Sequence, residues 1–217
     1  MGVSSYFFRV IFLFFIRIIL SGEGILRRGN VISKKKIKAM QKIILTYGLI
    51  AGAIVSSMLV ITQPLLSNGM INYDNGMIVG YTSMVIALSV VFFGIKTFRD
   101  QEGKGKISFG TAFKIGILIT LIASLMYAIS WEIYYNTVGS DFMEKYTSYH
   151  IQKLQASGAT AEKIEATQKE MAAFSEQYKN PVIRFGMTLL EIFPVGILIT
   201  LLCAALLRKK EILPQNA

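Results

Sequence analysis

Four long runs of apolar positions organise the chain, and charged or turn-forming residues bound each of them. A helix of roughly 20 apolar residues is needed to cross a hydrocarbon core of about 30 Å. The runs that reach this length cover residues 43–66, 75–95, 108–131 and 182–207. Because lipid offers no partners for backbone N–H and C=O groups, such runs must be helical. The pattern predicts an all-α integral membrane protein with four transmembrane helices.

The segment between the third and fourth runs, residues 136–180, is polar and has helical periodicity on both sides of Ser157-Gly158. This dipeptide is a turn signal. Thr160 can cap a second helix, and Asn180-Pro181 can end it. The pattern predicts an extracytoplasmic helical hairpin whose apolar faces pack on each other or rest on the bilayer surface.

The N-terminal region has a fifth apolar stretch, residues 6–20, which is short and interrupted by Arg9 and Arg17. Two interpretations stay open for residues 1–39. In the first interpretation, they form an extension with a helix lying in the membrane interface, where the arginines snorkel to water. Alternatively, they precede the natural start at Met40. The predicted organisation is therefore an extension over residues 1–39, a four-helix membrane domain over residues 40–210 and a cytoplasmic tail over residues 211–217.

Composition changes the picture through the placement of charge. The chain has 23 Lys and Arg against 13 Asp and Glu, a net charge of +10, and a mean hydropathy of +0.51. Lys and Arg number seven in residues 21–42, none in residues 67–76 and four in residues 96–106. Residues 132–181 hold five Lys against seven acidic residues. Because basic residues gather on the cytoplasmic side, both termini are expected in the cytoplasm of a bacterial inner membrane.

The basic segments adjoin membrane spans, so we expect them to contact anionic lipid headgroups. No nucleic-acid recognition motif accompanies the charge, and nucleic-acid binding is not expected. The expected partners are the lipid bilayer and either further copies of the chain or another membrane protein.

Small residues recur at every fourth position in three of the predicted spans, which lets helices approach closely in lipid. These stripes predict packing seams in a compact bundle. Whether one seam serves a homodimer stays open. The seam residues are Gly48, Gly52 and Ser56 in the first span, Gly116, Thr120 and Ser124 in the third, and Gly196 and Thr200 in the fourth.

Glu191 is the sharpest single feature, because it lies about 5 Å from the middle of the fourth predicted span at 1.5 Å per residue. A carboxylate at this depth must be protonated, paired or facing a hydrated cavity. Pro194 leaves the Leu190 carbonyl without its helical partner and favours a kink. Two interpretations stay open: an ion- or proton-coupled site, or a structural carboxyl. In the second case its hydrogen-bond partners are expected to be Thr120, Ser124 or Tyr127.

Lys114 is the obvious opposite charge to Glu191, but it lies in the cytoplasmic third of its span and is expected to snorkel to the interface. Gln63-Pro64 is interpreted as a helix-ending signal. Glu132, His150 and Arg184 are expected near the outer surface, where an ion pair can form.

Enzymatic chemistry is not predicted. The chain has a single His150 and a single Cys203, which cannot build a typical zinc site and exclude a disulfide scaffold. We therefore assign no catalytic residue, no metal and no cofactor.

Several motifs carry a family resemblance. They are Gly94-Ile-Lys-Thr-Phe-Arg-Asp, Ile107-Ser-Phe-Gly-Thr-Ala-Phe-Lys-Ile-Gly, Ser130-Trp131 and Glu191-Ile-Phe-Pro-Val-Gly196. Over residues 40–210 the chain resembles the bacterial family labelled domain of unknown function DUF4199, typical of Bacteroidetes. The resemblance implies a four-helix inner-membrane protein with a long loop before the last helix. It implies no activity and no catalytic residues.

The leading hypothesis for function is a non-enzymatic inner-membrane protein, a structural or accessory component acting in an oligomer. The alternative is a small transporter or an ion- or proton-conducting protein that uses Glu191.

Overall fold

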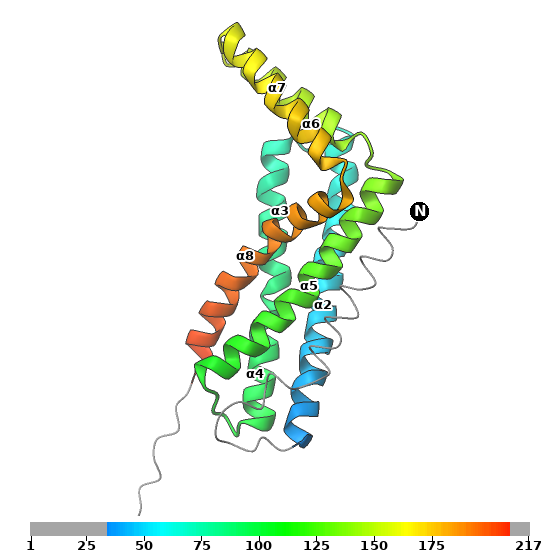
Figure 1. The fold of residues 1–217 in the computed structure, drawn as a ribbon. Coiled ribbons are helices and arrows are strands. Elements are labelled where there is room, and N and C mark those ends of the chain that lie inside the picture. Colours follow the sequence, from blue (N-terminus) through cyan, green and yellow to red (C-terminus); the bar gives the residue numbers. More distant parts are fainter. Residues whose placement is uncertain (1–33, 209–217) are drawn as a thin grey trace, which may run out of the picture. The chain divides into compact units, whose positions relative to one another are not determined.

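A computed structural model describes residues 34–208, and every regular element in this range is a helix. The predicted interfacial helix at residues 6–20 and the cytoplasmic tail lie outside the described residues. Figure 1 shows the helices in chain order. They are α2 (Lys34–Ser67), α3 (Tyr73–Leu88), α4 (Val90–Glu102), α5 (Phe109–Thr137), α6 (Phe142–Ala156), α7 (Ala161–Tyr178) and α8 (Pro181–Leu207).

Four helical segments are long and apolar enough to cross a membrane, and they match the four predicted runs. They are Lys34–Ser67, Tyr73–Glu102, Phe109–Thr137 and Pro181–Leu207, with lengths of 34, 30, 29 and 27 residues. Each is longer than the roughly 20 residues that a bilayer requires. This is the architecture of a multi-pass membrane protein.

The observed helices extend beyond the predicted runs at several ends. Helix α2 includes the lysine-rich turns from Lys34 onward. These turns are too polar for a membrane span, but lysine is compatible with a helix in water. Helix α2 also continues through Pro64 to Ser67, so the interpretation of Gln63-Pro64 as a helix end was wrong. Proline so close to a helix end removes only the hydrogen bond to the Val60 carbonyl.

The second run contains a local break. Ser89 separates α3 from α4, although its backbone keeps helical angles and the Phe92 N–H donates to its carbonyl oxygen at 3.0 Å. The break therefore leaves one continuous span over Tyr73–Glu102.

The chain divides into two compact units, and each of the long helices α2, α5 and α8 contributes to both. Unit 1 contains, within the described range, residues 34–51, 88–123 and 195–208. Its core is aliphatic and includes Ile44, Ile95 and Ile119, which are almost fully buried. The Tyr47 and Thr97 hydroxyls, from α2 and α4, lie 2.7 Å apart and add a polar link.

Unit 2 contains residues 52–87 and 124–194, and its core is aromatic. Leu59, Trp131, Met143 and Tyr178 are buried together, with further tyrosines and phenylalanines packed around them. This cluster draws side chains from α2, α5, α6 and α7. It therefore joins the polar segment of the chain to the apolar helices of the same unit.

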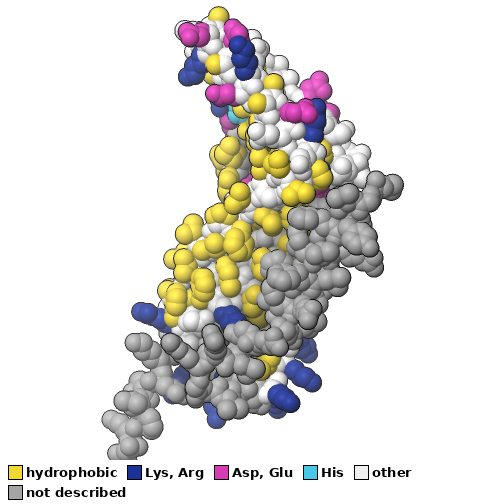
Figure 2. Space-filling model, in the orientation of Figure 1, with side chains coloured by type: hydrophobic (Ala, Val, Ile, Leu, Met, Phe, Trp, Pro, Cys, Tyr) yellow, Lys and Arg dark blue, Asp and Glu magenta, His cyan; other side chains and the backbone are white. Residues whose placement is uncertain are grey.

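Within unit 2, α6 and α7 pack against each other as a helical hairpin (Figure 1). Gly158 takes a positive φ of 75° in the turn, a conformation that glycine adopts without strain. Thr160 caps α7 as predicted, since its hydroxyl oxygen accepts a hydrogen bond from the Lys163 N–H at 3.3 Å. Figure 2 shows acidic and basic side chains gathered on the hairpin.

Candidate functional site

Glu132 on α5 and Arg184 on α8 form a two-bond ion pair inside unit 2. Arg184 Nε donates to Glu132 Oε1 at 2.8 Å, and Arg184 Nη2 donates to Glu132 Oε2 at 2.6 Å. The two side chains are only 3% and 9% exposed, for Arg184 and Glu132 respectively. Forked guanidinium–carboxylate pairs are among the strongest hydrogen-bonded contacts in proteins. The ion pair expected from the sequence is therefore present, and we call it the Glu132–Arg184 clamp.

Protein groups surround the clamp on several sides. Arg184 Nη1 donates to the Tyr178 carbonyl oxygen at 3.1 Å, and Arg184 Cζ lies 3.9 Å from the centre of the Tyr135 ring. The Asn136 side-chain amide donates to the Glu132 carbonyl oxygen at 2.6 Å. Because these contacts come from α5, α8 and the end of α7, the clamp connects the hairpin to two of the long helices.

Tyr178, the last residue of α7, adds a second connection at the same place. Trp131 Nε1 donates to the Tyr178 hydroxyl oxygen at 2.8 Å, and the Phe142 ring of α6 lies 4.9 Å from the Trp131 ring in an edge-to-face contact. Burial, above all, raises the pKa of Tyr178 above its ordinary value. Hairpin, α5 and α8 thus meet at one polar and aromatic junction.

A second feature of unit 2 is a cavity of about 90 Å³ lined by Glu191. Its lining comes from α2, α3, α5 and α8. The polar residues among the lining are Thr62, Gln63, Ser83, Tyr127 and Glu191. Glu191 lines this cavity and is also exposed. The structure therefore brings the predicted carboxyl together with Tyr127, one of its three expected neighbours.

The polar groups of this cavity divide into two kinds. Thr62 Oγ1 donates to the Met58 carbonyl oxygen, and Ser83 Oγ donates to the Val79 carbonyl oxygen, both at 2.7 Å. By contrast, Gln63, Tyr127 and Glu191 make no side-chain hydrogen bond or ion pair with any residue in the described part of the chain. The side chains of Gln63, Tyr127 and Glu191 are thus available to bind a ligand in the cavity.

The other predicted site residues are not among those that line this cavity. Helix α8 continues through Pro194, which is exposed, up to Leu207. Lys114 is half-buried in the second turn of α5 and belongs to unit 1. The Thr120 hydroxyl, also in unit 1, lies 3.2 Å from the Thr200 hydroxyl and donates weakly to the Gly196 carbonyl oxygen at 3.5 Å.

The small residues lie at close approaches within each unit. A Cβ atom added to Gly48 would lie 2.8 Å from Ile122 Cβ, and one added to Gly116 would lie 2.7 Å from Thr200 Cγ2. A Cβ atom added to Gly196 would overlap the Thr120 side chain. These three contacts belong to unit 1. They allow α5 to approach α2 and α8 closely there.

In unit 2 the same stripes continue with polar contacts. A Cβ atom added to Gly52 would meet the side chain of Met126. The Ser130 hydroxyl donates to the Ser56 hydroxyl at 2.9 Å. Ser124 Oγ is buried and has no hydrogen-bond partner among the described residues. Helices α2 and α5 are therefore closely apposed in this unit as well.

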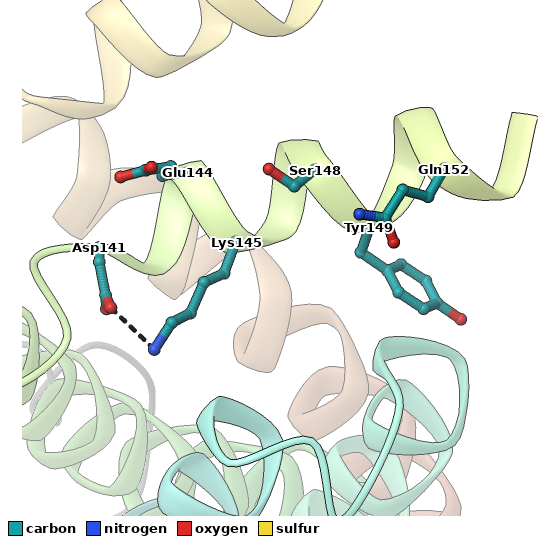
Figure 3. Close-up of a pocket in the computed structure, with 6 residues that line it drawn as sticks. All are labelled: Asp141, Glu144, Lys145, Ser148, Tyr149 and Gln152. Atoms are coloured by element: carbon teal, nitrogen blue, oxygen red, sulfur yellow. Dashed lines mark ion pairs between the residues drawn. The ribbon is translucent and has the colours of Figure 1, made fainter. Parts of the chain in front are cut away.

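A shallow groove of about 310 Å³ runs along α6 (Figure 3). Asp141 and Lys145 form an ion pair at its start, and Glu144, Ser148, Tyr149 and Gln152 continue the lining. All six residues belong to α6 or immediately precede it, so the groove is a feature of the hairpin surface. Apart from the polar character of the segment, no sequence pattern predicted this groove.

His150 packs against the rings of Tyr146 and Tyr149, at 4.3 and 5.7 Å between ring centres, and does not take part in the clamp. Cys203 is buried in α8. Over residues 34–208 there is no group of three His, Cys, Asp or Glu residues that could hold a metal ion.

The sequence did not predict that Gln63 lines this cavity, and it left Tyr127 as one alternative among three. Both residues lie within apolar spans. Which neighbouring helix each side chain faces depends on how its own helix is rotated about its axis. The only available signal was the presence of amide and phenol groups inside long apolar runs.

The chain was compared with known protein families. The family described as "Protein of unknown function (DUF4199)" matches residues 46–209. No curated protein and no solved structure matches the chain.

Proposed function

The chain belongs to the DUF4199 family of proteins of unknown function, so we propose a function from the geometry. The protein acts as an accessory protein of the bacterial inner membrane that presents its hairpin to a partner. The partner is a second copy of the chain or another membrane protein. The observation that carries this proposal is the Glu132–Arg184 clamp.

The clamp supports the proposal because it orders the hairpin before any partner arrives. Holding a binding surface in its final conformation reduces the entropy lost on association. Glu132 and Arg184 lie at the base of the hairpin, beside Tyr178 at the end of α7. Beyond this base, α7 presents alternating charges that suit recognition of a polar partner surface, including exposed Lys163, Glu165, Lys169 and Glu170.

Charge distribution supports an extracytoplasmic hairpin. Within unit 1, Lys34, Lys35, Lys36 and Lys38 precede the apolar part of α2, and Lys104 and Lys106 follow α4. Anionic lipid headgroups on the cytoplasmic surface favour such residues. The hairpin, with its excess of acidic residues, then belongs on the opposite side of the membrane.

We propose a non-enzymatic role because the sequence shows no recognisable catalytic set, and the chain has a single histidine and a single cysteine. The close approaches at Gly48, Gly116 and Gly196 lie within the chain, where small residues let its own helices pack closely in lipid.

Site-specific photo-crosslinking in intact membranes tests the proposal. A photoreactive residue at exposed Glu165 or Lys169 is expected to capture one constant partner or a second copy of the chain. The matched control is the same residue at Leu206, an exposed apolar position of α8. Purification in mild detergent is expected to recover the same species. Recovery of monomer alone, with no hairpin crosslink above the Leu206 control, would contradict the proposal.

Ion or proton conduction is a second candidate, favoured by the cavity that Glu191 lines. Here Glu191→Gln is expected to abolish pH-dependent flux in reconstituted vesicles while the protein still folds. Absence of any ion flux in the unmodified protein would exclude this candidate.

A further inference from the structure

Three polar side chains from three helices meet at the Glu191 cavity. Gln63 comes from α2, Tyr127 from α5 and Glu191 from α8, and all belong to unit 2. None of them makes a hydrogen bond or ion pair with another described residue. Polar groups without partners are costly inside a membrane span. The cavity therefore favours a guest that supplies those partners.

The hydroxyl groups around the cavity determine the chemistry of that guest. Thr62 and Ser83 already direct their protons to the carbonyl oxygens of Met58 and Val79. Each hydroxyl oxygen thus presents only lone pairs to the cavity. The Glu191 carboxylate, the Gln63 amide oxygen and the Tyr127 phenol oxygen add further lone pairs to the lining, although Gln63 and Tyr127 also carry donor protons. Oxygen acceptors of this kind suit hard metal cations.

The charge of the lining determines the valence of the cation that the cavity can bind. Glu191 is the one charged side chain among the described residues that line the cavity. In a medium of low dielectric constant an ion pair with no net charge is far less costly than one that leaves a charge uncompensated. A single carboxylate balances one positive charge, so a divalent cation would remain uncompensated.

The volume of the cavity admits such a guest. A buried water needs roughly 10–15 Å³ of space, whereas this cavity offers about 90 Å³. There is room for one cation that keeps part of its hydration shell. We propose that the cavity binds one partly hydrated alkali-metal cation, held by Glu191 with Gln63, Tyr127, Thr62 and Ser83 as neutral oxygen ligands.

This site is independent of the hairpin function proposed above, and it does not require that the cation move across the membrane. Binding without flux would make the cation a structural ligand of unit 2. Failure of the site would leave the crosslinking test of the hairpin unaffected.

Thermal unfolding of the full-length protein in mild detergent tests the site. Melting temperatures are compared in lithium, sodium, potassium and N-methyl-D-glucamine chloride, at equal ionic strength and one fixed alkaline pH. A cation that binds the folded state is expected to raise the melting temperature saturably, by about 3–6 °C at ten times its dissociation constant. N-methyl-D-glucamine is too large for the cavity and is expected to give the baseline.

Variants separate the site from general salt effects. Glu191→Gln is expected to abolish the cation-dependent shift, and Tyr127→Phe to raise the concentration needed for half of it. Glu144→Gln, on the exposed face of α6, is the matched control and is expected to keep the full shift. If Glu191→Gln does not fold, Gln63→Leu replaces it with the same expected loss of the shift. Equal melting temperatures in all four chlorides, or a shift that survives loss of the carboxylate or the amide, would overturn the proposal.

Discussion

Arg184, in the first turn of α8, binds both carboxylate oxygens of Glu132, in the second half of α5, and the two residues are 52 positions apart in the sequence. The same guanidinium donates to the carbonyl oxygen of Tyr178, the last residue of the hairpin. One arginine therefore links three helices of unit 2. This relationship explains how a polar hairpin can be held in one place on apolar helices.

Removing one member of the clamp is expected to destabilise the protein strongly. Arg184→Met leaves the Glu132 carboxylate buried without its partner, which typically costs about 3–5 kcal/mol. Replacing both residues, Glu132→Leu with Arg184→Met, is expected to recover most of this loss because no buried charge remains. Unfolding in detergent, followed by circular dichroism, measures both effects.

The control for the clamp is an exposed ion pair on the hairpin. Lys169 Nζ lies 2.8 Å from Glu165 Oε1 on α7, and both side chains are mostly exposed. Lys169→Ala is expected to change stability by less than about 0.5 kcal/mol. Equal losses for Arg184→Met and Lys169→Ala would show that burial gives the clamp no special weight.

Close packing in unit 1 predicts a contrast between two glycines of α8. Gly196→Ala places a methyl group against Thr120 and is expected to cost about 1–3 kcal/mol. Gly186→Ala has open space within 4 Å and is expected to be neutral or stabilising by about 0.5–1 kcal/mol. Thermal unfolding of the two variants side by side checks the contrast, which disappears if the Gly196 contact is loose.

Tyr178 predicts a dependence of stability on alkaline pH. Burial raises its pKa in the folded state above the ordinary value of 10.0. The unfolded chain then loses the phenol proton first, so the stability that neutral Tyr178 contributes is fully present below pH 10.0 and declines as the pH rises further. Relative to Tyr178→Phe, the natural protein is expected to lose stability above that pH.

Denaturant titrations at several alkaline pH values measure this difference, and an ultraviolet titration of tyrosinate reports the ionisation itself. The Phe variant also lacks the acceptor for Trp131 Nε1, which gives a constant offset at neutral pH. A difference between the two proteins that does not change with pH would contradict the expectation.

Loop charges predict the orientation of the chain. Reporter fusions after residues 72 and 158 are expected to give an extracytoplasmic signal, and a fusion after residue 101 a cytoplasmic one. Residue 158 lies in the turn between α6 and α7 and is exposed, so a fusion there leaves both helices intact. A cytoplasmic signal at residue 158 would reverse the orientation.

Much of the fold could be predicted from the sequence, because each span carries its own signal. Long apolar runs indicated all four long helices, and Gly158 and Thr160 marked the hairpin turn and the cap of α7. These features depend on neighbouring residues alone. The continuation of α2 through Pro64 was not predicted from the sequence. A proline in the last turn costs a single hydrogen bond, and a helix can tolerate that loss.

The candidate site could be predicted only in part. Glu191 stood out because a carboxyl in an apolar run is rare, and the Glu132–Arg184 pair followed from opposite charges near span ends. Gln63 and Tyr127 did not stand out as its neighbours. Their meeting at one cavity depends on how each helix is rotated about its axis, which long apolar runs with weak periodicity do not specify.

The central claim is that the clamp fixes the hairpin on the helices of unit 2. The most direct test compares amide hydrogen exchange in the natural protein and in the Glu132→Gln variant. The account predicts faster exchange in α6, α7 and the first turns of α8 when the clamp is weakened, with the exchange of α4 in unit 1 unchanged. Hairpin exchange that is the same in both proteins would contradict it.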